Sequence, residues 1–231
     1  MYRSAKTGIE LSGIILPGGP GWPRYEITPD HFEVASGETG VIVAPPAIRR
    51  LLADVLTGLA APDAGQIHVR GEEMTGPTPG PRKIALVPAD GGLLPHLTVE
   101  RNAEFAAGTG PRKQRRARVR RVLADLDLGS LARLRPHQLS AEQRLRVAVA
   151  RVRCLPSPGA CAVVIEDCGT GACQAAVATA AGDDLAVVVV VGSEDRAREL
   201  GAYDAVAGGS GAGALARLRP VRPSGVPSDP G

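Results

Sequence analysis

The chain lacks any apolar run long enough to cross a membrane. Its longest such run, Leu185 to Val191, covers 7 residues, whereas a membrane-spanning helix needs about 20. The N-terminus, Met1 to Ser4, leads into no apolar stretch of the kind that signal peptides carry. We therefore expect a cytoplasmic chain that reaches a membrane only through a partner.

Lysine is scarce, with 3 residues against 24 arginines and a net charge of +3. This imbalance is typical of GC-rich coding and does not indicate a polyanionic partner. Zinc spacing is absent too, because intervals of 7, 7 and 5 residues separate the cysteines at 154, 161, 168 and 173. Reduced thiols of a cytosolic protein fit this pattern. The histidines at 31, 68, 96 and 137 show neither ligand nor triad spacing, so no chemistry is assigned to them.

A length of 231 residues suits one large α/β domain, or a domain with a small subdomain. Short apolar segments at 9–16 and 25–34, each followed by turn residues, predict a hairpin-rich β region. Further strands are predicted at 41–43, 66–70, 84–87, 162–165 and 185–191. The last two are valine-rich and do not alternate with polar residues. Such runs are typical of a parallel sheet that is covered on both faces.

Helical patterns occupy the remaining segments. One helix is predicted over 49–59, closed by Gly58, and another follows Asn102. A later helix carries an apolar stripe and stops near Gly129; the stripe consists of Val119, Val122, Leu123 and Leu126. Glycine, proline, serine and arginine dominate beyond residue 207. We therefore predict one domain over 1–218, a helical subdomain over about 89–153, and a disordered tail over 219–231.

Three segments occur in an informative order. Leu139 to Arg151 reads LSAEQRLRVAVAR, and Ser140 with Gln143 forms a capping box that starts a helix. Some forty residues earlier lies Leu94 to Asn102, LPHLTVERN. About ten residues after the helix, the strand 162–165 ends in an acidic pair. A loop and a helix capped by Thr98 would account for Thr98 but not for the whole LPHLTVERN string.

In this order, the segments resemble the nucleotide-binding subunits of ATP-binding cassette (ABC) transporters, whose signature reads LSGGQ-x-QRVA-x-AR. The resemblance implies an α/β fold: a P-loop NTPase-like parallel sheet core with an antiparallel β portion and a helical subdomain. It also implies ATP and Mg²⁺ as ligands. The implied partners are a membrane permease at the inner face of the cell membrane and a second cassette subunit, in a homodimer or heterodimer.

The segment matching the family's phosphate loop, GxxxxGK[ST], departs from it. It has no glycine and is one residue short, and it comprises Ala44, Pro45, Pro46, Ala47, Ile48, Arg49, Arg50 and Leu51. The lysine position falls on Arg49 or Arg50, and the Mg²⁺-binding hydroxyl is replaced by Leu51 or Leu52. Proline has no N–H to donate to a phosphate. The arginine pair would either attract an anion loosely or form the solvated start of an amphipathic helix.

Two further motifs are altered where the family contacts nucleotide and metal. The glutamine that coordinates magnesium is replaced by Ala89, so that metal ligand is lost. In the signature, Ser140 and Gln143 remain, whereas Ala141 and Glu142 replace two glycines. Glu142 would place a carboxylate beside a phosphate, although it favours a helix N-terminus.

The acidic pair and the segment after the last strand also differ. The family's Asp-Glu order is inverted, so that Glu166 takes the metal position and Asp167 the catalytic position. Ser193 replaces the γ-phosphate-sensing histidine. The aromatic residue that stacks on adenine has only displaced candidates, Trp22 or Tyr25, and core packing is the simpler role for either.

We therefore interpret the chain as a degenerate cassette subunit, a pseudoenzyme with weak or absent ATP binding and hydrolysis. One alternative is a soluble non-catalytic interaction or regulatory domain that keeps the fold. Another is a nucleic-acid binder through Arg112 to Arg121. That run lacks interleaved aromatic residues and continues into the apolar stripe, which favours a solvated helix face. No nucleic-acid partner is expected.

Overall fold

The computed structural model describes residues 7–76, 79–156, 159–169, 171–181, 185–200 and 215–221. Its framework is one ten-stranded sheet. The strands are β1 (Thr7–Leu16), β2 (Tyr25–Thr28), β3 (His31–Ala35), β4 (Thr39–Val43), β5 (Ala64–Val69), β6 (Glu72–Glu73), β7 (Ile84–Val87), β8 (Ala162–Glu166), β9 (Ala186–Val191) and β10 (Leu215–Pro220).

The sheet has a parallel half and an antiparallel half. Strand order is β6-β5-β1-β2-β10-β4-β9-β8-β7, with β3 paired to β1. Strands β10, β4, β9, β8 and β7 run parallel, whereas β1 pairs antiparallel with β2, β3 and β5. Strand β10 joins the halves, because it runs parallel to β4 and antiparallel to β2. The predicted parallel core with an antiparallel portion is therefore confirmed.

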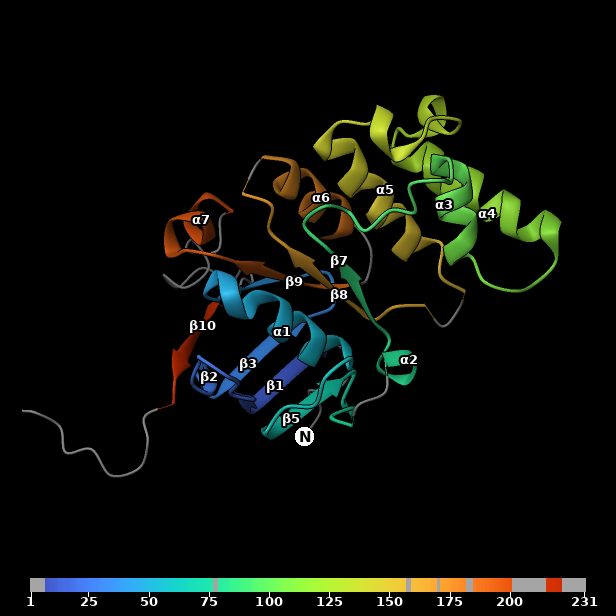
Figure 1. The fold of residues 1–231 in the computed structure, drawn as a ribbon. Coiled ribbons are helices and arrows are strands. Elements are labelled where there is room, and N and C mark those ends of the chain that lie inside the picture. Colours follow the sequence, from blue (N-terminus) through green and yellow to red (C-terminus); the bar gives the residue numbers. More distant parts are fainter. Residues whose placement is uncertain are drawn as a thin grey trace, which may run out of the picture.

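Helices cover both faces of the parallel strands, as Figure 1 shows. They are α1 (Pro46–Thr57), α2 (Pro79–Arg82), α3 (Val99–Ala106), α4 (Arg112–Asp125), α5 (Ala141–Arg153), α6 (Gly171–Ala181) and α7 (Glu194–Glu199), with short 3₁₀ turns at Gly129–Leu131 and Pro136–Gln138. In β9, Val188 and Val190 belong to the core beneath α1, whereas Val187, Val189 and Val191 pack with residues of α5 and α6. A continuous valine run therefore buries apolar surface on both faces.

Helix α1 starts earlier than the sequence pattern predicted. It begins at Pro46 rather than at Arg49, because a proline in the first turn has the fixed φ of a helix and needs no N–H partner there. It ends at Thr57, and Gly58 closes it with a left-handed φ of 85° as predicted. Buried Arg82 completes this end by donating to the carbonyls of Val55 and Leu56.

The predicted helical region is built around α3, α4 and α5, which share one buried apolar cluster. The segment Leu94–Asn102 and the helix from Ser140 therefore lie side by side (Figure 1). Fully buried Asn102 ties the segment together: its side-chain amide donates to the carbonyls of Leu94, Leu97 and Thr98, and its oxygen accepts from the Leu94 N–H. Thr98 caps α3 by accepting from the Arg101 N–H.

Two expected boundaries differ from the structure. Helix α4 ends at Asp125, and Gly129 starts a 3₁₀ turn instead of closing the helix. The tail expected from residue 219 overlaps β10, in which Arg219 and Pro220 pair with Glu26 and Tyr25. Residues 222–231 lie outside the described part of the chain. Among the described helices, none combines the length and the apolar character needed to cross a membrane.

Candidate functional site

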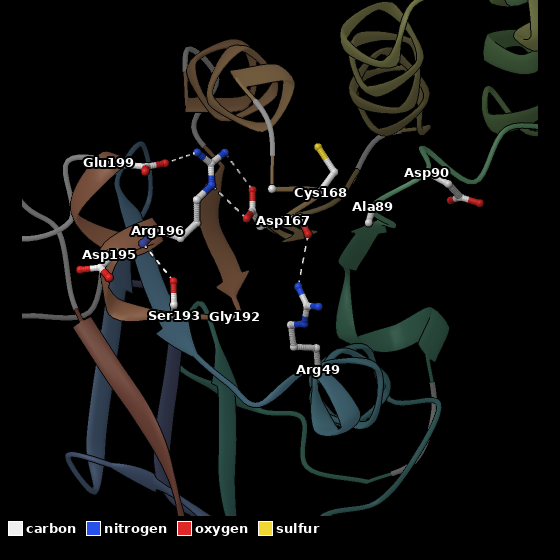
Figure 2. Close-up of a pocket in the computed structure, with 11 residues that line it drawn as sticks. Arg49, Ala89, Asp90, Asp167, Cys168, Gly192, Ser193, Asp195, Arg196 and Glu199 are labelled. Carbon is white, nitrogen blue, oxygen red and sulfur yellow. Dashed lines mark hydrogen bonds and ion pairs between the residues drawn. The ribbon is translucent and has the colours of Figure 1, made fainter.

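A cavity of about 710 Å³ opens at the carboxyl ends of the parallel strands. This is the edge at which open α/β sheets place their ligands. Figure 2 shows side chains converging on it from the ends of β7, β8 and β9 and from α1 and α7. Its lining residues are Arg49, Ala89, Asp90, Asp167, Cys168, Gly169, Gly192, Ser193, Asp195, Arg196 and Glu199.

The connection from β4 to α1 is only two residues long, Ala44 and Pro45. The Ala44 N–H already pairs with the carbonyl of Val191 at 2.9 Å. Pro45 and Pro46 carry no N–H, and the N–H groups of Ile48 and Arg49 both donate to the Pro45 carbonyl. This segment therefore has few free backbone N–H groups that could bind an anion, whereas a phosphate loop provides several.

Arg49 is the member of the arginine pair that reaches the cavity. Its Nη1 donates to the backbone carbonyl of Asp167 at 3.4 Å, as Figure 2 shows. Arg50 is exposed and forms an ion pair with Asp54 one turn later, at 3.0 Å. The sequence left open whether Arg49 or Arg50 takes the family's lysine position. In the structure the two arginines have different surroundings. Of the two, Arg49 places its positive charge at the strand edge.

Asp167 is held by a bidentate ion pair with Arg196. Nε of Arg196 lies 3.0 Å from one carboxylate oxygen of Asp167, and Nη2 donates to the other at 3.1 Å. The two side chains are only 3% and 14% exposed. The bond to Asp167 is the main cause that raises the pKa of the Arg196 guanidinium above its ordinary value. The Arg196 guanidinium is therefore charged at neutral pH and stays bound to the Asp167 carboxylate.

A third group completes the surroundings of the Asp167 carboxylate. The buried thiol of Cys173, near the start of α6, is hydrogen-bonded to it. Burial raises the pKa of Cys173 to about 12, and the negative charge of Asp167 adds to the shift. Cys173 is therefore a neutral thiol at physiological pH.

Glu166 lies beside the cavity but not in its lining. Its Oε2 accepts from the Ala89 N–H at 3.4 Å. Its Oε1 is buried and has no hydrogen-bond partner among the described groups. Ala89, at the position of the lost glutamine, does line the cavity. The two inverted carboxylates therefore have different surroundings, since Asp167 is fully paired and Glu166 is not.

Ser193 serves the backbone of α7. Its Oγ accepts from the Arg196 N–H at 3.2 Å, so the hydroxyl acts as the N-cap of that helix. Sequence reasoning identified Ser193 as a site position but missed Arg196, three residues later, and Glu199, which accepts from Arg196 Nη1 at 2.6 Å. A serine followed by acidic residues signals a helix start. No local signal links Arg196 to Asp167.

Several residues proposed from the sequence lie away from the cavity. Ala44 and Ile48 are buried in the core beneath α1, and Leu51 packs against that core. Ser140 and Gln143 cap α5, where the Gln143 N–H donates to Ser140 Oγ at 3.1 Å. Neither is among the described residues that line the cavity, and the remaining segment members Pro45, Pro46 and Ala47 are not either.

Solved structures first identify the fold. An ATP-binding cassette of an ABC transporter in its ADP conformation aligns with a TM-score of 0.64 and 16% identity, covering 84% of each chain. Part of the ABC transporter complex cbiONQ from Clostridium perfringens aligns with a TM-score of 0.65 and 16% identity, over 84% of this chain and 82% of the other. The fold is therefore the P-loop-type α/β fold of ABC ATPases.

Sequence comparisons then define the family. Residues 47–158 match the ABC transporter family model. The molybdate/tungstate import ATP-binding protein WtpC of Pyrococcus horikoshii is 35% identical over 131 residues, covering 55% of this chain and 38% of that protein. The thiamine import ATP-binding protein ThiQ of a Ruegeria species is 37% identical over 122 residues, with coverages of 51% and 52%. Over about half of its length, the chain is therefore similar to the ABC transporter ATP-binding family.

A third relative extends this pattern. The Fe(3+) ions import ATP-binding protein FbpC of Serratia marcescens is 41% identical over 126 residues, which cover 52% of this chain and 36% of that protein. The chain thus spans about half or less of the length of these curated relatives. The similarity reaches the helical region and the segments around it.

Proposed function

We propose that this chain is an ATP-binding-cassette subunit of an import transporter whose own nucleotide site does not hydrolyse ATP. The import role rests on the names of the relatives, all of which are import ATP-binding proteins. The observation that carries the loss of hydrolysis is the two-residue connection between β4 and α1. The segment from Ala44 to Leu51 is then a remnant of the phosphate site.

The phosphate groups of ATP do not fit the residues at this edge. A phosphate loop wraps its ligand with several converging backbone N–H groups. Here two prolines have none, and the N–H groups of Ile48 and Arg49 are paired with the Pro45 carbonyl. The cavity lining also holds four carboxylates, Asp90, Asp167, Asp195 and Glu199, against two guanidinium groups. Arg49 alone offers weak, salt-sensitive attraction to an anion.

The Mg²⁺ ion that accompanies ATP in this family does not fit either. The Asp167 carboxylate is engaged on both oxygens by Arg196, so a cation would first have to displace a buried guanidinium. The glutamine position is Ala89, and no cluster of three or more His, Cys, Asp or Glu side chains suited to a metal ion occurs within the described ranges. We therefore derive no hydrolytic step through Mg²⁺. In this proposal Asp167 serves as the ion-pair partner of Arg196, and Ser193 serves as the N-cap of α7.

The helical region, about residues 89–153, is the part proposed to serve a transporter. Its segment Leu94–Asn102 is held by the buried Asn102 network, and α5 starts with an intact capping box. These features give a rigid surface beside the strand edge on which a permease could dock. In this proposal the chain sits at the inner face of the cell membrane, bound to a permease and paired with a catalytically intact cassette or a second copy.

Phosphate release from MgATP tests the loss of hydrolysis. The purified chain should release phosphate no faster than buffer, and Asp167→Asn should leave that rate unchanged because the carboxylate is not used in catalysis. Magnesium-dependent turnover that disappears in Asp167→Asn would contradict the proposal. An intact cassette from a relative, assayed in parallel, establishes that the assay detects this chemistry.

Calorimetric titration tests the remaining phosphate affinity separately. We expect ATP, GTP and inorganic triphosphate to bind with similar dissociation constants near or above about 1 mM, which corresponds to about 4 kcal/mol. Arg49→Gln should abolish this binding, whereas Arg50→Gln, at an exposed residue paired with Asp54, should not. Micromolar affinity selective for adenine and resistant to salt would mean that a working phosphate cradle still forms.

A further inference from the structure

We propose that the outer face of α4, together with Phe105 on α3, binds the surface of an anionic lipid bilayer. Helix α4 lies at the outer edge of the helical region, with α3 beside it (Figure 1). It is separate from the cavity at the strand edge, whose lining contains no residue of α4. The inference goes beyond the cassette function and needs no permease. It concerns the chain's own surface.

Positive charge is concentrated on α4. The helix carries seven cationic side chains within ten residues and one carboxylate, Asp125, near its end. Its net charge is therefore +6, while the whole chain carries +3, so the other 217 residues together carry −3. A helix of 14 residues is about 21 Å long, which gives a dense basic stripe.

The contacts of these cations leave most of the charge uncompensated. Arg115 and Arg118 donate to backbone carbonyls, those of Gly108 and of Leu155, and carbonyls do not neutralise them. Arg116 forms an ion pair with Glu104 at 3.3 Å, but Glu104 is shared with Arg101. The exposed members at the surface are Arg112, Lys113, Arg120 and Arg121. Such a stripe attracts anionic headgroups within about a Debye length.

The neighbouring helix α3 carries an exposed aromatic side chain. Phe105 is 66% exposed, the most exposed of the large apolar side chains in the described part of the chain. It follows Glu104, whose bond to Arg116 links α3 to α4. An exposed phenyl ring on the helix that is joined to the basic helix suits a membrane interface, where charged groups meet headgroups and an apolar ring enters the acyl boundary.

Lipid fits this surface better than nucleic acid does. Single-stranded nucleic acid is bound by aromatic platforms that stack successive bases, and α4 itself carries no aromatic residue. Duplex recognition inserts a helix into a groove, whereas α4 packs Val119, Val122 and Leu123 against the helical region and offers only its outer side. The exposed cations along the outer side of α4 are suited to a planar anionic surface.

Vesicle sedimentation tests the proposal on the full chain. The probes are vesicles of phosphatidylcholine alone and vesicles in which a third of the lipid is phosphatidylserine. We expect binding to the anionic vesicles at low salt, loss of that binding at high salt, and no binding to neutral vesicles. Each neutralised cation should lower the partition coefficient about fivefold. The triple variant Arg112→Gln, Lys113→Gln, Arg120→Gln should therefore bind about 100-fold more weakly.

A matched control separates local charge from net charge. Arg24→Gln, Arg70→Gln and Arg219→Gln remove three exposed arginines elsewhere, so both variants lose the same charge. The control variant should keep binding within about twofold of the original chain, with circular dichroism confirming the fold of both. Equal losses in the two triple variants would overturn the proposal, because the contact would then follow net charge alone.

A tryptophan reporter locates the contact. In a Trp22→Phe background, Phe105→Trp gives a single indole whose emission should shift to shorter wavelength on anionic vesicles only. An unshifted emission while the chain sediments would place the contact elsewhere and overturn the assignment. Duplex DNA that displaces the chain from the vesicles and binds it more tightly at the same salt would also overturn it, in favour of nucleic acid.

Discussion

The strand edge and the helical region are both held by buried polar groups, but of different kinds. At the strand edge the network is ionic, with Arg196 bridging Asp167 and Glu199 beside a cavity of about 710 Å³. In the helical region it is neutral, with Asn102 satisfying four backbone groups of its own segment. The ionic network joins Asp167 to Arg196, 29 positions apart in the sequence, whereas the neutral network joins residues no more than eight positions apart.

This difference teaches which features of a cassette depend on its ligand. The cap at Ser140 and the Asn102 network satisfy the chain's own backbone, so they contribute stability with or without nucleotide. The carboxylate of a phosphate site needs a cation from outside, and here Arg196 supplies that charge internally. The strand edge thus holds a buried ion pair in a place where a ligand site is expected.

The largest effect is expected from Arg196→Ala. It leaves Asp167, 3% exposed, without its counter-charge. Breaking such a pair should lower the free energy of unfolding by about 3–4 kcal/mol. Arg198, on the same helix and 53% exposed, pairs with Asp195. Arg198→Ala should cost less than about 1 kcal/mol. Urea unfolding measures both, and equal costs would mean that the strand edge is no more than a solvated surface.

Next in size is Asn102→Ala in the helical region. The change leaves the N–H of Leu94 and three carbonyls without their side-chain partner in a buried position, so we expect a loss of about 3 kcal/mol. Gln114→Ala, at an exposed position of α4, is the control and should be near neutral. If Asn102→Ala proved as mild as its control, the neutral network would not be what orders the segment 94–102.

A smaller loss, about 1 kcal/mol, is expected from Ser140→Ala, because the Gln143 N–H at the start of α5 loses its acceptor. Ser140→Asp should restore most of this stability, since an aspartate also caps a helix. Thermal unfolding can compare the three chains. A cost similar to that of Arg196→Ala would show that the helix start depends on more than its cap.

Each of the two regions contains one buried thiol with a raised pKa, so the stability of the chain should depend on pH in the alkaline range. Burial raises the pKa of Cys173 at the strand edge to about 12 and that of Cys154 at the end of α5 to about 11. The folded chain therefore retains these protons after the unfolded chain has lost them, so stability is full below about pH 9 and falls as pH rises towards 11–12. Each thiol contributes up to about 1.4 kcal/mol per pH unit in this window.

Cys173→Ala should reduce this slope, and Cys168→Ala, a change at a half-buried residue of the cavity lining, is the comparison. Urea midpoints between pH 8 and 10.5 give the slopes. An unchanged slope in Cys173→Ala would mean that its thiol already ionises alike in the folded and unfolded chains.

Local sequence patterns predicted the elements whose causes are local. The strand over 84–87 and the helix from Ser140 follow from an apolar run and a capping box. The sequence pattern places helix α1 three residues late, because consecutive prolines favour a loop, whereas Pro46 occupies the first turn. The sequence pattern does not predict strand β10, since Leu215–Pro220 has little strand character of its own and is ordered by pairing with β4 and β2.

The sequence by itself determined the resemblance to the ABC family, the positions of the strands over 84–87 and 162–165, and the absence of glycines from the phosphate loop, because these depend on residue type and spacing. Only the tertiary structure decided that Arg49 rather than Arg50 faces the strand edge, that Asp167 is paired with Arg196, and that the two halves of the sheet meet at β10. Each of these depends on contacts between segments distant in sequence, whose energies exist only once the sheet has brought the segments together.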